Sequence, residues 1–287
     1  MLTCRSRIRQ TAGDRGGSTH PIGQEILEVM AFTLSHAAAA WPFRRTRLDL
    51  SALLVGCFVP DLLYFVLLRH AFDPHSWTGM FLFDLPVGLV LLGLFQAFAK
   101  QPSLIFLPDG IRRRIKAGRY KFLPLTRLAI IVVSILVGTS THLLWDSVTH
   151  SFYWPYRHWS FLRMMIQIPI VGQMAMYRLL QYVSSAAGLI AVALWIWHWY
   201  RSTPPVEHPI PQPFTPKLRL VIMITLPLLA IWGGIHRAHQ VIKDIHSLRS
   251  EANFMTDAVV IAIAIFGLGL LACGIILDVR HTDRDPG

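Results

Sequence analysis

Long apolar stretches with few charges constrain this chain more than any other feature of its sequence. A helix that crosses a bilayer needs about 20 mostly apolar residues. Six stretches approach or reach that length: 50–68, 79–99, 128–145, 183–200, 218–235 and 256–277. The mean hydropathy of +0.46 and the 15% share of charged residues agree with this pattern. The sequence therefore predicts an all-α fold, a polytopic membrane helical bundle of about six transmembrane helices.

The segment before the first apolar stretch changes character at Met30. Residues 1–29 are polar, basic and rich in glycine, which predicts a disordered tail or a mis-assigned start. The following AFTLSHAAAAW favours a helix but is too short to span a bilayer. It predicts an N-terminal half-helix that ends at Pro42 and the RRTR cluster. One helical membrane domain is expected over 30–287, with its ligand-bearing part at 30–182 and C-terminal helices at 183–287.

Membrane topology explains the formal net charge of +11 better than nucleic acid does. Lys and Arg lie between the apolar stretches and show no aromatic RNA-binding pattern. From Met30 onward they are concentrated in alternate loops, above all in 100–127, and the positive-inside rule places those loops in the cytoplasm. The expected partner is the lipid bilayer of the inner (plasma) membrane.

The three cysteines, Cys4, Cys57 and Cys273, are too widely separated to indicate a disulfide framework.

The most informative motif is GTSTHLLWDSVTH, from Gly138 to His150, at one end of the third apolar stretch. Residues four apart share a helix face, so His142, Asp146 and His150 point the same way, and Ser134 and Gly138 continue that face. Two imidazoles and a carboxylate at this spacing suit a divalent metal such as zinc. A purely structural polar network is the alternative. Ionisable groups in lipid are costly without partners, which favours the metal.

Other ligand-type residues are expected at the same depth. At a rise of about 1.5 Å per residue, Asp61 and His142 each lie roughly 21–22 Å above the cytoplasmic end of their helix. Pro60 breaks the first span beside Asp61 and frees a carbonyl near Gly56. The remaining candidates flank the second span or lie on the half-helix: His75, Asp84 and His36. Six groups of ligand type thus converge, on the extracytoplasmic side.

Several of these residues also have a structural interpretation. Asp61 can cap backbone groups freed by Pro60, and Asp84 can pair with Arg69 at the membrane interface. His150 can serve as a hydrogen-bond partner of a ligand rather than as a ligand. These alternatives remain open at the level of sequence.

The stretches FTLSHAAAAWP, VGCFVPDLLYF, HSWTGMFLFDLPVG, GTSTHLLWDSVTH and LLQYVSSAAG resemble, in order and spacing, a bacterial membrane family of unknown function, the domain-of-unknown-function 4184 family. More distantly, the chain is similar to inner-membrane metal-dependent hydrolases and to the zinc-dependent phospholipase C and P1 nuclease fold. The resemblance implies Asp61, His75, His142 and Asp146 as metal ligands, with His36 serving a second metal. The soluble enzymes use a further His-x-x-x-Glu, which this chain lacks.

The leading hypothesis is a membrane-embedded hydrolase with one or two zinc-type ions. It would act on a lipid-linked or amphipathic ester, and the family resemblance points to a phosphoester. The catalytic candidates are Asp61 and Asp84, and the metal candidates are His36, Asp61, His75, His142, Asp146 and His150. The alternatives are a metal- or proton-coupled transporter and a non-catalytic scaffold stapled by a metal.

Overall fold

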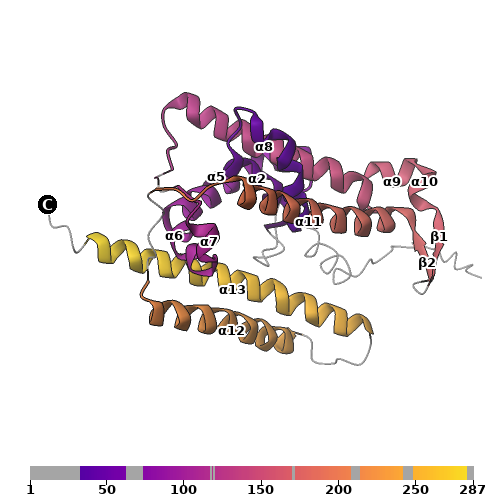
Figure 1. Cartoon of the computed structure of the whole chain (residues 1–287). Coiled ribbons are helices and arrows are strands. Elements are labelled where there is room, and N and C mark those ends of the chain that lie inside the picture. The colour runs from indigo at the N-terminus through magenta and orange to yellow at the C-terminus, as the bar shows by residue number, and fades with distance from the viewer. Residues whose placement is uncertain are drawn as a thin grey trace, which may run out of the picture.

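A computed structural model describes residues 33–62, 74–116, 118, 120–169, 172–207, 214–241 and 248–282. Within these residues the chain is almost entirely helical, as Figure 1 shows. The strands are short, β1 (Met165–Ile168) and β2 (Gly172–Ala175), and pair as an antiparallel hairpin. The predicted all-α, polytopic helical fold is confirmed.

Five helical segments are long and apolar enough to cross a membrane: Trp77–Ser103, Leu125–His158, Met176–Ser202, Pro216–Gln240 and Ala258–Leu277. They correspond to the second to sixth predicted spans. The first predicted span is described only as a shorter apolar helix, Leu50–Asp61, because the rest of 50–68 lies largely outside the described residues. The predicted tail at 1–29 lies outside them entirely, and the division of the membrane domain near residue 182 stays a prediction.

The elements of the first half surround the longest helix of that half. The structure contains η1 (Leu34–Arg45), α2 (Leu50–Phe58), η2 (Val59–Asp61), α4 (Trp77–Gly79), η3 (Met80–Asp84), α5 (Leu85–Leu94), η4 (Phe95–Ala99), α6 (Lys100–Ser103), η5 (Leu104–Phe106), α7 (Asp109–Arg112) and α8 (Leu125–Thr149). The turns of η1, η2 and η5 are 3-10 helical, and those of η3 and η4 are π-helical. The segment from α4 to α6 is therefore one span with two wide turns, and π-turns are frequent near functional sites.

The elements of the second half are α9 (Trp154–His158), α10 (Ser160–Arg163), the β hairpin, α11 (Met176–Ser202), α12 (Pro216–Val241) and α13 (Leu248–Thr282). In Figure 1, α11 runs beside α8, and α9, α10 and the hairpin lie together at one end of this pair. The α12–α13 pair forms a separate layer, in which α13 contacts η4 and α6 of the first half. Apolar side chains such as Trp232 and Leu268 are exposed on this layer, as lipid contact requires.

The half-helix ends in the region that the sequence predicts, at Pro42 and the RRTR cluster. η1 continues through this proline and ends at Arg45, inside the cluster. Proline fixes φ near −65°, a value that suits a 3-10 turn, and removes only one donor. The half-helix packs against α2, α8 and α11.

A direct backbone contact between α2 and α8 sets the position of the site. A Cβ on Gly138 would lie 2.2 Å from the Leu53 carbonyl oxygen, and one on Gly56 would lie 2.2 Å from the Ile135 carbonyl oxygen. Only glycine fits at either position, and small residues are what allow membrane helices to approach this closely. Gly138, which the sequence places on the helix face of His142 and Asp146, is therefore a packing residue.

The start of α2 is fastened to the same helix. The Asp49 carboxylate accepts a hydrogen bond from the Ala52 N–H as the N-cap of α2, and also pairs with Arg127 of α8. The Asp49 N–H donates to Ser134 Oγ at 2.8 Å. Buried Ile131 and Ile135 of α8 then pack with Ala52 and Leu92 as the core of this half. The two helices are thereby held in one register along their contact.

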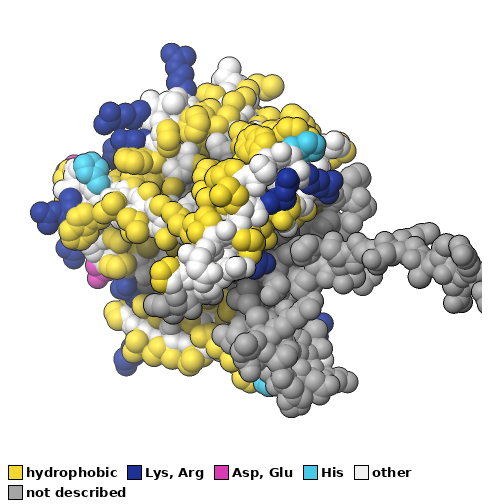
Figure 2. All heavy atoms as spheres, turned by 90° about the vertical axis from the view of Figure 1, so that its right-hand side faces the viewer, with side chains coloured by type: hydrophobic (Ala, Val, Ile, Leu, Met, Phe, Trp, Pro, Cys, Tyr) yellow, Lys and Arg dark blue, Asp and Glu magenta, His cyan; other side chains and the backbone are white. Residues whose placement is uncertain are grey.

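The β hairpin was not predicted. The segment 151–182 is rich in Trp, Tyr, Arg and Met, a composition that suits the lipid headgroup level. Within it, MIQI alternates between exposed and half-buried side chains, and Gly172 has a positive φ of 91°. Three of the four residues in MIQI are apolar, so this alternation in exposure is not visible in the sequence. Figure 2, which faces this end of the molecule, shows hydrophobic side chains over much of the described surface, with Lys and Arg at scattered points.

The α2–α8 contact predicts that Gly138→Ala destabilises the fold by about 1–3 kcal/mol, the usual range for overpacking. The added methyl group meets a backbone carbonyl of α2, which has no rotamer with which to move away. Gly93→Ala is the matched control, because a Cβ there meets nothing within 4 Å. Thermal unfolding in detergent is the measurement. Equal midpoints for the two variants would contradict the contact.

Candidate metal centre

The break at Pro60 exposes backbone carbonyls of α2 that accept hydrogen bonds from α8 beneath the site. Proline has no N–H, so the Gly56 carbonyl lacks its helical partner, and the chain continues as the 3-10 turn η2. Thr139 Oγ1 of α8 donates to the Gly56 carbonyl at 3.2 Å, and the neighbouring Cys57 carbonyl accepts a 2.8 Å hydrogen bond from His142 Nδ1. The same proline turns Asp61 toward α8. The break thus places Asp61 beside α8 and frees two carbonyls, of Gly56 and Cys57, that accept hydrogen bonds from this helix.

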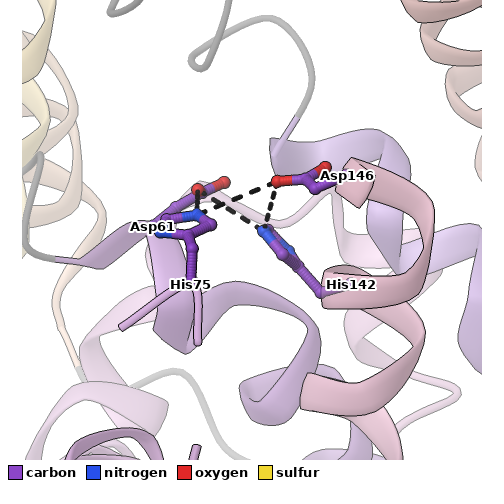
Figure 3. A group of neighbouring side chains, drawn as sticks. All are labelled: Asp61, His75, His142 and Asp146. Carbon is purple, nitrogen blue, oxygen red and sulfur yellow. Dashed lines mark hydrogen bonds and ion pairs between the residues drawn. The ribbon is translucent and has the colours of Figure 1, made fainter. Parts of the chain in front are cut away.

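Four side chains from three segments meet above these carbonyls. Figure 3 shows Asp61, His75, His142 and Asp146 pointing toward one another. Their nearest ligand atoms all lie within 4.8 Å of one another, and all four residues are buried. His142 Nε2 lies 3.1 Å from Asp146 Oδ2 and 3.5 Å from Asp61 Oδ1. His75 Nε2 lies 3.2 Å from Asp61 Oδ1 and 3.8 Å from Asp146 Oδ2.

These separations fit a small divalent ion. Zinc binds imidazole nitrogen and carboxylate oxygen at about 2.0–2.2 Å, so two ligand atoms of a tetrahedral site lie roughly 3.4 Å apart. The four nitrogen–oxygen separations of the cluster, 3.1 to 3.8 Å, bracket that value. Two imidazoles and two carboxylates also make a chemically suitable donor set.

His142 is prepared as a ligand by its other nitrogen. A carbonyl oxygen only accepts, so Nδ1 carries the proton in the bond to Cys57, and Nε2 of the neutral ring would be the nitrogen that coordinates a cation. His142 is fully buried, and its Nε2 has no hydrogen-bond partner among the described residues. An orphaned lone pair in a buried site is costly unless a cation or donor meets it. This nitrogen faces both carboxylates of the cluster.

The charge of the site also favours a cation. Asp61 and Asp146 are buried among apolar helices, where an ionised carboxylate needs a partner. A structural network would instead require a protonated His142 that pairs with Asp146 at 3.1 Å. A divalent ion would neutralise both carboxylates and use the same lone pair. The buried Asp/His cluster is therefore able to hold a metal.

Two supporting residues were not singled out from the sequence. Thr33 Oγ1 donates to Asp61 Oδ2 at 2.5 Å, so it holds the carboxylate oxygen that does not face the cluster. Tyr153 donates through its hydroxyl to the His75 carbonyl at 3.3 Å, and so connects the segment after α8 to the loop that carries His75. Outer partners of this kind orient metal ligands. Neither residue belongs to a recognisable spacing pattern, because each acts from a different segment.

His36 approaches from the half-helix. Its ring stacks on that of His142, with centroids 4.0 Å apart, and its Nε2 lies 3.4 Å from Asp146 Oδ1. This is the oxygen of Asp146 that faces away from the four-residue cluster. The structure thus brings His36 to the edge of the site, and its role as a ligand stays a prediction.

His150 lies on the same outer side of Asp146. Its Nδ1 is 3.8 Å from Asp146 Oδ1 and 3.3 Å from Thr149 Oγ1, and its Nε2 is 3.3 Å from the Gln181 side-chain amide. Both nitrogens have polar neighbours, an arrangement that suits either a supporting group or a ligand of a second ion. Gln181, from α11, is a further buried neighbour that the sequence did not identify.

Asp84 does not join the cluster. It is completely buried at the end of η3, but it is not among the four residues whose ligand atoms converge. Its suggested partner Arg69 lies outside the described residues. A catalytic role for Asp84 therefore stays a prediction.

The cluster predicts that the purified protein binds one or two equivalents of zinc or a similar ion after mild chelation and reloading. His142→Ala combined with Asp146→Ala should abolish that binding, because it removes two of four ligands. His198→Ala is the control, since His198 lies exposed on α11, away from the site. Elemental analysis measures the result. Unchanged metal content in the double variant would refute the centre.

Comparison with known proteins agrees with this architecture at the level of the family. The comparisons with curated proteins and with solved structures gave no match. A family model described as a domain of unknown function (DUF4184) matches residues 30–277, which include all four residues of the cluster and the five long apolar helices. The chain is therefore a member of the DUF4184 family.

Proposed function

We propose that this protein is a membrane-embedded metal hydrolase that acts on a lipid-linked or amphipathic ester, a phosphoester by preference. The observation that carries the proposal is the unpartnered Nε2 of His142, which faces two buried carboxylates and a second histidine. A zinc-type ion held there would lower the pKa of a coordinated water and polarise an ester oxygen. No other arrangement of the described residues offers comparable chemistry.

The residues of the site would have different roles, according to their positions around the ion. His75, His142 and Asp146 would hold the ion from two segments. Asp61 has one oxygen toward both histidines and the other fixed by Thr33, so it is placed either to complete the ligand set or to orient a water molecule. Asp84, buried one π-helical turn into the span, is the proposed proton-transfer group.

A second ion would be accommodated on the outer side of Asp146. Its Oδ2 faces His142 and His75, whereas its Oδ1 faces His36 and His150. A carboxylate with ligand-type nitrogens on both sides is suited to bridge two ions. Two equivalents of metal in the wild type and one in a His36→Ala variant would support this reading of the site.

The proposed substrate class follows from the neighbourhood of the site. Tyr153 connects the His75 loop to a segment with exposed aromatic side chains, among them Phe152, Trp154 and Trp159. Aromatic side chains of this kind are enriched where a membrane meets water. An ester bond at headgroup level would reach the cluster from this segment while its lipid part remained in the bilayer.

Hydrolysis of chromogenic esters tests the proposal. We expect the zinc-loaded protein in detergent to hydrolyse a p-nitrophenyl phosphodiester or a medium-chain p-nitrophenyl carboxylate. Asp84→Asn should lower the rate about 100-fold or more, the usual contribution of general acid–base catalysis, while metal content stays unchanged. Asp109→Asn is the control, because Asp109 is exposed in α7 and pairs with Arg112.

Two other outcomes would replace the hydrolase. Four protein ligands are also typical of closed structural zinc sites, so a slowly exchanging ion with no hydrolysis of any ester would indicate a metal-stapled scaffold. Zinc uptake into vesicles that contain the protein, driven by a proton gradient, would indicate a transporter.

The proposed location is a bacterial inner membrane, with the metal centre toward the extracytoplasmic side. The basic loop at 100–127 would be cytoplasmic by the positive-inside rule. In a cysteine-free background, Ser151→Cys should react with a membrane-impermeant thiol reagent in intact cells, and Gly118→Cys only after lysis. Labelling of Gly118→Cys from outside would invert the orientation and exclude an outer-leaflet substrate.

A further inference from the structure

A groove of about 770 Å³ lies between η1, α2 and α11. Its walls are apolar along most of their length, with Leu34 and Ala37 from η1, Leu54 and Phe58 from α2, and Leu189 and Val192 from α11. Arg44 and Arg45, also in the lining, come from the last turn of η1. The groove is therefore apolar with a strongly basic mouth.

The order of the elements places both arginines at one end of this groove. Leu50 begins α2 and Trp199 lies in the last turn of α11, and both line the groove together with Arg44 and Arg45. The opposite end is lined by residues next to the site, since Phe58 precedes the Pro60 break and Leu34 follows Thr33. The apolar part thus extends from the basic end of the molecule toward the depth of the metal centre.

The length of the groove matches one leaflet. On α11 the lining residues run from Leu189 to Trp199, ten residues along the helix or about 15 Å at roughly 1.5 Å per residue. One leaflet contributes about 15 Å of hydrocarbon. A ligand that fills the groove therefore has a long apolar chain and an end group at the arginines.

Charge identifies that end group. Arg44 donates to the Trp41 carbonyl and lies over the Trp41 ring at 5.0 Å, and it remains exposed, as does Arg45. Neither guanidinium has a carboxylate partner among the described residues, and the nearby Asp49 is engaged by Arg127. Guanidinium groups bind phosphate through paired, charge-assisted hydrogen bonds. An anionic lipid satisfies both features, whereas a zwitterionic lipid leaves one negative charge neutralised by its own amine.

We propose that this groove is a binding site for an anionic phospholipid, with an acyl chain between η1, α2 and α11 and the phosphate against Arg44 and Arg45. The site is distinct from the metal centre and does not require that the protein be a hydrolase. A bound lipid would cover the face of η1 that lines the groove. η1 begins directly after Thr33 and carries His36 to the edge of the candidate metal centre.

Tryptophan quenching by brominated lipids tests the proposal, because Trp195 and Trp199 both line the groove. The full-length protein in detergent is titrated with brominated phosphatidylglycerol or brominated phosphatidylcholine. We expect a saturable component with at least ten-fold preference for phosphatidylglycerol, which should disappear from the Trp195→Phe, Trp199→Phe double variant. Electrostatic attraction near a membrane surface corresponds to roughly five-fold per basic residue, so Arg44→Gln with Arg45→Gln should remove the preference.

Matched variants separate the groove from general surface charge. Arg47→Gln with Lys217→Gln removes two exposed basic residues that do not line the groove, and it should keep the preference. Metal content should stay unchanged in both pairs of charge-removing substitutions, and this result would show that these variants keep the fold. Equal affinity for the two lipids, or a preference that persists without Arg44 and Arg45, would overturn the proposal. Absence of quenching by either lipid would also overturn it, since the groove would then be filled by protein, either a second copy or another part of the chain.

Discussion

The close contact between α2 and α8 is the constraint on which the rest of the structure depends. Gly56 and Gly138 each leave room for a carbonyl of the opposite helix, so the two backbones touch. At this distance the hydroxyl of Thr139 and the imidazole of His142 reach the carbonyls exposed beside Pro60. A looser contact would separate the helix that carries Asp61 from the helix that carries His142 and Asp146. The close packing of the small residues therefore sets the distances within the candidate metal centre.

The buried polar groups of the site are stable only together, because each is a partner of another. Each carboxylate or imidazole buried among apolar helices is costly alone, and each is supported here by a group from another segment. Thr33 holds one oxygen of Asp61, Cys57 fixes the proton of His142, and Asp146 presents its two oxygens to different histidines. The unpartnered nitrogen at the middle is the group that this network leaves for a ligand.

The two halves of the chain contribute differently to this arrangement. The elements from η1 to α8 supply all four residues of the cluster. From the second half, α11 contacts His150 through Gln181 and forms one wall of the groove beside η1 and α2. The α12–α13 layer contacts the first half mainly through α13 and exposes apolar side chains. Its contribution is to the membrane-facing surface, since none of its described residues belongs to the cluster.

The sequence by itself determined the long helices and the residues that form the cluster. Apolar length predicts helices almost irrespective of context, because a backbone in lipid must satisfy its own hydrogen bonds. Four-residue spacing places His142 and Asp146 on one face of α8 before any tertiary contact forms. Depth estimated from helical rise then brought Asp61 to the same level. These inferences depend on local geometry, which one segment specifies alone.

Only the tertiary structure decided how the segments meet. Asp84, at the end of the π-helical η3, is not among the four residues whose ligand atoms converge. Thr33, Tyr153 and Gln181 support the site from three different segments, so no spacing pattern reveals them. The continuation of η1 through Pro42 depends on its packing against α2 and α11. Depth and helix face are properties of one segment, whereas contact across segments depends on rotation and register, which neither composition nor periodicity specifies.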